Sequence, residues 1–201
     1  GNRVVSSSYE PGSVQKVLTM AALVDAGLVT TETRVEVPAA LPSGDHKITD
    51  AWDHDTLYMT TRGVLVKSSN IGTVLLARQL DKARMRSYLA GFGLGSATGV
   101  ELPGEGTGKL GILPDADMPD YTRDQISFGQ GLSVNAVQMT AAVSAVVNGG
   151  VYHQPSIVKA ATAADGTALE LPTPATHRVV SEEASAAVLE MMESVITLNE
   201  K

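Results

Sequence analysis

A hydroxyl and an amine lie one helical turn apart near the start of the chain, in the run Glu10-Pro11-Gly12-Ser13-Val14-Gln15-Lys16. Pro11 and Gly12 interrupt whatever precedes them, and Ser13 is a residue type that favours helix starts. Residues three apart share one face of a helix, so we expect the Lys16 amine beside the Ser13 hydroxyl. A lysine kept neutral by burial can take the serine proton. The spacing therefore predicts a lysine-activated serine nucleophile.

The helix that carries this pair is expected over residues 13–26, stopped by Gly27. Its Val, Leu, Met and Ala side chains occupy nearly every face, which is typical of a buried helix. The alternative is a helix-capping Ser13 and a snorkelling Lys16, because Ser-x-x-Lys also arises by chance. A second match, Ser156-Ile157-Val158-Lys159, follows Pro155 in an extended stretch, and we interpret it as non-catalytic.

A second hydroxyl and an amide occur 55 residues after Ser13, in the run Lys67-Ser68-Ser69-Asn70-Ile71-Gly72. Helices are expected on both sides, over 55–66 with Asp55 as cap and over 71–80, so Ser68 to Asn70 would form the corner. A site that breaks and remakes an amide needs proton transfer to the leaving nitrogen and a group that holds the substrate backbone. Ser68 and Asn70 can supply these, although a capped turn between helices is the alternative. Lys67 is interpreted as a surface lysine at a helix end.

Three further strings follow in order: Thr98-Gly99-Val100-Glu101-Leu102-Pro103-Gly104-Glu105, Phe128-Gly129-Gln130-Gly131 and Asn148-Gly149-Gly150. With the two runs above, their order and intervals resemble the transpeptidase domain of penicillin-binding proteins, most closely the class B, monofunctional type. The resemblance covers nearly the whole chain. It implies an α+β, beta-lactamase/transpeptidase-like fold, of which this chain is mostly the helical part, with the central antiparallel sheet incomplete at both ends.

The resemblance also implies a role for each motif residue. Ser13 would be the acylated nucleophile, Lys16 its base, Ser68 a proton relay and Asn70 an amide that orients substrate. The implied activity is a D,D-transpeptidase that attacks a D-alanyl-D-alanine stem peptide and cross-links peptidoglycan, with beta-lactams acylating the same serine. A D,D-carboxypeptidase, a serine beta-lactamase and a non-catalytic beta-lactam sensor or scaffold remain alternatives.

The third motif of the family, Lys followed by Thr or Ser and then Gly, does not occur in the chain. We therefore interpret residues 1–201 as a partial domain, with a loop-rich helical subdomain at 28–120 and a return to the core at 121–201 that ends before the missing strand. Loss of one oxyanion donor costs about 10² to 10³ in rate. We expect no turnover by this polypeptide alone, and a second polypeptide piece with the missing strands beside it.

Composition excludes several classes of partner and cofactor. The formal charge is −7, and no cluster of Lys and Arg is present, which argues against nucleic acid. The absence of cysteine excludes disulfides and thiolate metal sites. No apolar run reaches the length of a membrane span. No cofactor or metal is expected, and the resemblance implies an extracytoplasmic domain held by a membrane anchor upstream of this chain.

The remaining elements are expected from periodicity and from capping residues. They are a strand at 34–38, a helix at 81–90 capped by Asp81, a Gly- and Pro-rich connector at 91–120, a buried helix at 133–147, an extended stretch at 151–160, a surface hairpin or loop at 161–176, and a final helix opened by Ser181.

Some apparent motifs are interpreted as structural. The run Gly106-Thr107-Gly108-Lys109-Leu110-Gly111 fits the dinucleotide fingerprint, but no strand precedes it and no helix follows, so a flexible turn is favoured. Asp53-His54-Asp55 is interpreted as a solvated loop rather than a metal site. No catalytic role is assigned to the isolated histidines His46, His153 and His177.

Overall fold

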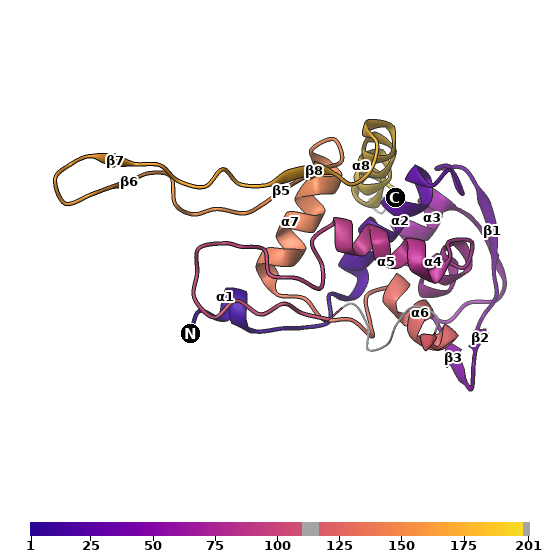
Figure 1. The fold of residues 1–201 in the computed structure, drawn as a ribbon. Helices are drawn as coiled ribbons and strands as arrows, with labels where there is room; N and C mark the ends of the chain where they lie inside the picture. Colours follow the sequence, from indigo (N-terminus) through magenta and orange to yellow (C-terminus); the bar gives the residue numbers. More distant parts are fainter. Residues whose placement is uncertain (110–116, 199–201) are drawn as a thin grey trace.

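The computed structural model describes residues 1–109 and 117–198. Its helices gather into one body around α2 (Gln15–Asp25), and a thin arm projects from that body (Figure 1). The other helices are α1 (Arg3–Ser6), α3 (Thr61–Val66), α4 (Asn70–Ala77), α5 (Lys82–Gly91), α6 (Asp120–Ser127), α7 (Ala136–Val147) and α8 (Glu182–Thr197). Among them, α6 has no counterpart in the elements predicted from the sequence.

Helix α2 is the centre of the body because nearly all of its side chains are buried, including Leu18, Met20 and Leu23. It packs against α4, α7 and α8, and it ends at Gly27, which has the left-handed φ of +68° that favours glycine. The prediction of a buried helix is confirmed. The alternative in which Ser13 serves as a helix cap is not supported, because a 3₁₀ turn, η1 (Gly12–Val14), already places Ser13 inside helical structure without a capping hydrogen bond.

The strands of the described residues form four separate antiparallel pairs rather than one broad sheet. The pairs are β1 (Arg34–Val37) with β4 (Leu57–Thr60), β2 (Leu41–Ser43) with β3 (His46–Ile48), β5 (Val151–His153) with β8 (Thr176–Arg178), and β6 (Ala161–Thr162) with β7 (Ala168–Leu169). This agrees with the expectation that the chain is mostly the helical part of its fold.

The helix expected over residues 55–66 is wrong in its first half. Leu57 to Thr60 is strand β4, paired with β1 in a register that places Arg34 opposite Thr60. Thr60, rather than Asp55, caps α3, because its side chain accepts the N–H of Gly63 at 3.1 Å. Pairing with a distant strand has therefore overridden the local helical pattern.

The other helix starts are closer to expectation. Asp81 and Ser181 cap α5 and α8 as predicted. Helix α7 begins three residues later than expected, because Asn135 and Gln138 form a reciprocal capping box. Ser133 instead pairs with Lys109 in an isolated antiparallel bridge.

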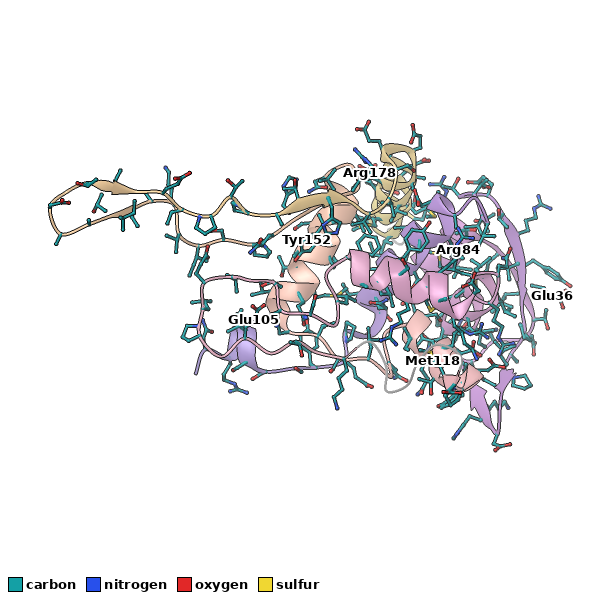
Figure 2. All side chains as sticks on the ribbon, viewed as in Figure 1. Glu36, Arg84, Glu105, Met118, Tyr152 and Arg178 are labelled. Carbon is teal, nitrogen blue, oxygen red and sulfur yellow. The ribbon has the colours of Figure 1, made fainter. Side chains whose placement is uncertain are left out.

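The arm consists of residues 151–178 (Figures 1 and 2). At its base β5 packs against α7, and its outer part, with β6 and β7, stands clear of the helices. Its base is anchored by Tyr152, which is buried. Glu101, in the loop beneath, accepts the Ser156 hydroxyl at 2.7 Å and the Ile157 N–H at 2.9 Å. The predicted surface hairpin is confirmed, and Ser156 serves to fasten the arm to this loop.

A buried carboxylate joins the β2–β3 hairpin to the helices beside it. Asp124 of α6 is fully buried and accepts Arg78 at 2.6 Å, Arg123 at 2.8 Å and the Ser43 hydroxyl at 2.7 Å. Each oxygen of this carboxylate has charged or hydroxyl donors, as a buried charge requires. The network ties the hairpin to α6 and to Arg78 at the C-terminal end of α4.

Burial of α2 predicts a large stability difference between two truncations. Leu23→Ala removes a side chain with 0% exposure and should lower the free energy of unfolding by about 2–5 kcal/mol. Ile196→Ala, at 66% exposure on α8, should change it by less than about 0.5 kcal/mol. Urea unfolding of the intact protein measures both, and equal losses would contradict the central place of α2.

Candidate active site

The amine of Lys16 is the most unusual group in the body, because the residue is only 1% exposed. Its Nζ donates to the Ser68 carbonyl at 2.6 Å, to the Ser68 hydroxyl at 3.0 Å and to Asn70 Oδ1 at 2.8 Å. The structure thus brings together three of the four predicted site residues. The first turn of α2 supplies the amine, and the α3–α4 corner supplies its acceptors.

Two opposing effects set the charge of this amine. Burial lowers the pKa of Lys16 from its ordinary value to about 8, against the negative charge of Asp50, which raises it. A substantial fraction is therefore neutral near physiological pH. A neutral amine has a lone pair, so it can accept a proton from a neighbouring hydroxyl.

The corner between α3 and α4 has a strained backbone. Ser68 has a φ of +53°, a left-handed conformation that is rare for a residue other than glycine. Ser69 is buried and caps α4, accepting the Gly72 N–H at 2.9 Å. This turn directs both the carbonyl and the hydroxyl of Ser68 at Lys16, which explains why Ser68 and Asn70 reach the same amine.

Asp50 is a residue of this site that the sequence analysis missed. Its fully buried carboxylate accepts the N–H groups of Asn70 and Ile71, the latter at 3.0 Å, and the Ser69 hydroxyl at 2.7 Å. His54 Nε2 lies 3.1 Å from the same carboxylate. A carboxylate near a helix N-terminus is a recognisable sequence signal when it lies next to that helix. Asp50 lies 20 residues before Asn70, so the sequence does not link it to α4.

The interpretation of Asp53-His54-Asp55 as a solvated loop is wrong for its middle residue. The His54 side chain is only 6% exposed, and its second ring nitrogen lies 2.6 Å from the Asp55 carbonyl. These partners raise the pKa of His54, the Asp55 carbonyl most strongly, against the opposing effect of burial. The Asp50 carboxylate thus has two groups of partners. His54 contacts it from the loop, and the N–H groups at the start of α4 donate to it.

Ser13 lies at the exposed edge of the site, within η1 and one turn before Lys16. In the part of the chain that the structure describes, no hydrogen bond joins Ser13 to Lys16. The hydrogen bond expected from the spacing is therefore not formed, and Lys16 is instead bonded to the corner. The hydroxyl of Ser13 remains open to solvent.

The turn that carries Ser13 is held by the Phe128-Gly129-Gln130-Gly131 run. Gly12 N–H donates to the Gly129 carbonyl at 2.9 Å, and Gly131 N–H donates to Glu10 Oε1 at 2.9 Å. Tyr9 and Val134 exchange two backbone hydrogen bonds of 2.9 Å. Two strings that the sequence analysis noted separately are therefore one packed unit.

A polar hollow of about 300 Å³ opens beside Asn70. It is lined by Asn70 and by residues of β3, of the β3–β4 loop and of the α6–α7 region, namely Lys47, Ile48, Thr49, Asp50, Ala51, Tyr121, Phe128 and Gln130. Asn70 Nδ2 is itself fixed by the Thr49 carbonyl at 3.0 Å. The hollow thus reaches Asn70, whose Oδ1 accepts a hydrogen bond from Lys16.

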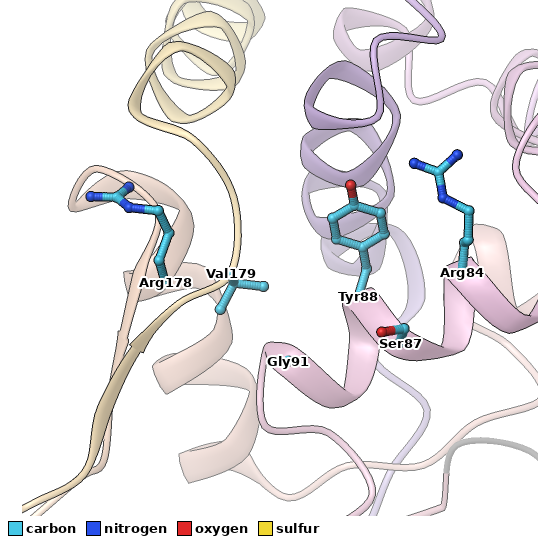
Figure 3. A pocket seen from close by; sticks show the side chains of 6 residues that line it. All are labelled: Arg84, Ser87, Tyr88, Gly91, Arg178 and Val179. Atoms are coloured by element: carbon cyan, nitrogen blue, oxygen red, sulfur yellow. The ribbon is translucent and has the colours of Figure 1, made fainter.

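A second pocket lies elsewhere, between α5 and the segment after β8 (Figure 3). Its lining residues are Arg84, Ser87, Tyr88, Gly91, Arg178 and Val179, and none of them contacts the Lys16 amine. The Tyr88 hydroxyl is bonded to Asp25 at 2.8 Å, and Arg178 lies 3.4 Å from Glu182. Because its lining residues are remote from Lys16 and from the α3–α4 corner, this pocket is not a candidate for the chemistry.

Other groups considered in the sequence analysis have structural partners. His46 stacks on Tyr121 with ring centroids 4.0 Å apart, and His177 lies 5.1 Å from Tyr152. Lys67 is exposed at the end of α3. In the run that fits the dinucleotide fingerprint, Gly106 and Lys109 bond to Val5 and Ser133, while positions 110 and 111 lie outside the described residues.

Across residues 1–109 and 117–198, no group of three or more acidic, His or Cys side chains is placed to hold a metal ion. No helix within these ranges has the length and apolar character needed to cross a bilayer.

Comparison with known proteins identifies the family. The model of the penicillin-binding protein transpeptidase domain matches residues 1–199. The chain belongs to this family. The transpeptidase domain expected from the five sequence strings is therefore confirmed.

Curated relatives of this transpeptidase chain include the penicillin-binding protein PbpB of Mycobacterium tuberculosis, 40% identical over 197 residues that make up 98% of this chain and 29% of PbpB. The peptidoglycan D,D-transpeptidase FtsI of Escherichia coli is 31% identical over 195 residues, covering 96% of this chain and 30% of FtsI. The chain thus spans about three-tenths of the length of these relatives.

Solved structures support the same fold. Penicillin-binding protein 3 from M. tuberculosis, in complex with aztreonam, has a TM-score of 0.91 and 39% identity, covering 97% of this chain and 43% of that one. A peptidoglycan synthetase from Bifidobacterium adolescentis has a TM-score of 0.89 and 34% identity, with 97% and 36% covered. The predicted α+β, transpeptidase-like fold is confirmed.

The close approach of Gly12 and Gly129 predicts a position-specific effect of adding one methyl group. A Cβ on Gly129 would lie 1.9 Å from the Gly12 carbonyl oxygen, so Gly129→Ala must displace the Ser13 turn. We expect a loss of more than about 3 kcal/mol in unfolding free energy, because overpacking adds to left-handed strain.

Gly104→Ala is the matched control, since Gly104 also has a positive φ but no heavy atom lies within 4 Å of its Cβ position. It should cost only about 1–2 kcal/mol. Chemical denaturation of both variants tests the difference, and a Gly129→Ala variant as stable as Gly104→Ala would refute this packing argument.

Proposed function

We propose that the protein containing this chain is a peptidoglycan D,D-transpeptidase in which Ser13 is the acylated nucleophile. One observation carries the proposal: a buried lysine amine with a pKa near 8 touches the Ser-x-Asn corner one turn from an exposed serine. Family membership supplies the reaction class, and the names of PbpB and FtsI agree with it.

In the proposed reaction, the Ser13 oxygen attacks the carbonyl of the terminal D-alanyl-D-alanine bond. Its proton passes to neutral Lys16, and Ser68 relays a proton to the departing nitrogen of D-alanine. Asn70 donates to the substrate backbone in the polar hollow. The amine of a second stem peptide then attacks the ester, which re-forms the Ser13 hydroxyl and leaves a peptide cross-link.

A beta-lactam carbonyl would be attacked in the same way and would leave an acylated Ser13. The M. tuberculosis neighbour with 39% identity is described in complex with ampicillin, which makes this class of inhibitor the natural probe. We further propose that the domain acts on the outer side of the membrane. The missing Lys-Thr/Ser-Gly motif would be supplied by polypeptide outside this chain.

Fluorescent penicillin tests the nucleophile. The intact protein should become covalently labelled, and Ser13→Ala should reduce labelling by at least about 10³-fold, because the attacking oxygen is gone. Ser156→Ala, in the second Ser-x-x-Lys string, should label like the parent. Persistent labelling of Ser13→Ala would remove Ser13 from this role.

The fate of the label separates the alternatives. Acyl-enzyme hydrolysed within seconds would indicate a beta-lactamase. Release of D-alanine without cross-links from stem peptides would indicate a carboxypeptidase. Stable label with neither product would indicate a sensor or scaffold.

The lowered pKa of Lys16 predicts the pH dependence of acylation. If neutral Lys16 takes the proton, the second-order rate constant should rise with pH through a midpoint of about 8 and fall about tenfold per unit well below it. Lys67→Ala removes an exposed lysine at the adjacent corner and should leave the midpoint in place. A midpoint above 10, or a flat profile, would contradict Lys16 as the base.

A further inference from the structure

We infer that Asp50 and His54 form a positioning pair that holds the Ser68–Asn70 corner against Lys16 and fixes the charge state of that amine. The inference rests on the proposed function, because the corner has a catalytic role only if Ser13 is acylated. Asp50 borders the polar hollow beside Asn70, but its carboxylate is fully buried, and His54 does not line the hollow, so both side chains act through other groups.

The first part of the argument is geometric. The Asp50 carboxylate binds the two N–H groups that open α4, those of Asn70 and Ile71, and also the hydroxyl of Ser69. Three consecutive residues after Ser68 are thereby fixed by one side chain. Because Ser68 has the strained φ of +53°, the turn needs such external constraint to persist. Without it, the three acceptors of Lys16 would lose their common orientation.

The second part concerns His54, which limits the motion of Asp50. His54 Nε2 lies 3.1 Å from Asp50 Oδ2, the oxygen that also accepts the Ser69 hydroxyl. The opposite ring nitrogen is bonded to the Asp55 carbonyl, so the ring has a fixed orientation. Both side chains are nearly or fully inaccessible, at 6% and 0% exposure. Solvent therefore cannot replace either partner without local opening.

The third part is electrostatic. Helix α4 carries no charged residue over Asn70–Ala77, and the loop from Phe128 to Asn135 carries none. On α2 the other charge is Asp25, at the far end of the helix and bonded to Tyr88 and Ser181. The α6 acid nearest the hairpin, Asp124, is paired with two arginines.

In the loop itself, Asp53 and Asp55 are exposed, as are Lys47 on β3 and Lys67 at the corner. Asp50 is the buried anion whose charge raises the Lys16 pKa, against the lowering by burial. His54, when protonated, partly cancels that charge. The pair therefore acts on both the position and the proton affinity of the Lys16 site.

Asp50→Asn is the direct test, measured as the rate of acylation of the intact protein by fluorescent penicillin across pH. The neutral amide keeps the shape but loses the charge and one acceptor, so the plateau rate should fall by about 10²-fold. The midpoint should move to lower pH by about one unit, because Lys16 loses its anion. Asp45→Asn, an exposed carboxylate in the β2–β3 turn, should change neither quantity.

His54 supplies an independent test if Asp50→Asn fails to fold. His54→Ala should lower the plateau rate by about tenfold, and His54→Gln, which can again donate to Asp50, should restore it to within about threefold of the parent. This rescue would not occur if the ring merely filled space.

An Asp50→Asn variant with an unmoved midpoint would overturn the inference, whatever its plateau, and so would a His54→Ala variant identical to the parent. If Ser13→Ala has lost its label in either case, the nucleophile assignment stands and only the pair is rejected. Label retained by Ser13→Ala would instead reject the proposed function.

Discussion

The arrangement of the site depends on one buried amine, that of Lys16, whose hydrogen bonds to water are replaced by hydrogen bonds to protein groups. Removing an ammonium group from water costs several kcal/mol unless other groups replace the lost hydrogen bonds. Lys16 has three acceptors, all from the α3–α4 corner. Segments more than 50 residues apart must therefore meet within hydrogen-bonding distance. Helix packing keeps these segments together, because α2 packs against α4 and against the long helices α7 and α8.

Further contacts hold the segments around the Lys16 amine in place. The β3–β4 loop supplies Asp50, which closes the N-terminus of α4. The buried Asp124 network fastens the β2–β3 hairpin that leads into this loop. On the opposite side, the α6–α7 loop pairs with the segment before Ser13. The amine thus lies where three loops and one helix start converge, and each loop is fixed by at least one buried hydrogen bond.

Much of this arrangement was predictable from the sequence, for identifiable reasons. Apolar residues on all faces of α2 indicated a buried helix, and single capping residues located α5 and α8. The corner and its approach to Lys16 followed from motif order. Strand β4 and the role of Asp50 were not predictable, because both depend on pairing between segments whose separation leaves no local pattern. The expected Ser13–Lys16 hydrogen bond is not formed, because helical spacing places two residues on one face but does not determine which acceptor the amine donates to.

The contact of Gly12 with Gly129 also restricts how this site can diversify. Main chain meets main chain there, so the wall behind the Ser13 turn presents no side chain that mutation can exchange. The lining of the polar hollow is different, because Lys47, Tyr121 and Gln130 contribute side chains that substitution can change. Sequence change near the site is therefore easier to accommodate in the hollow than at the Gly12–Gly129 contact.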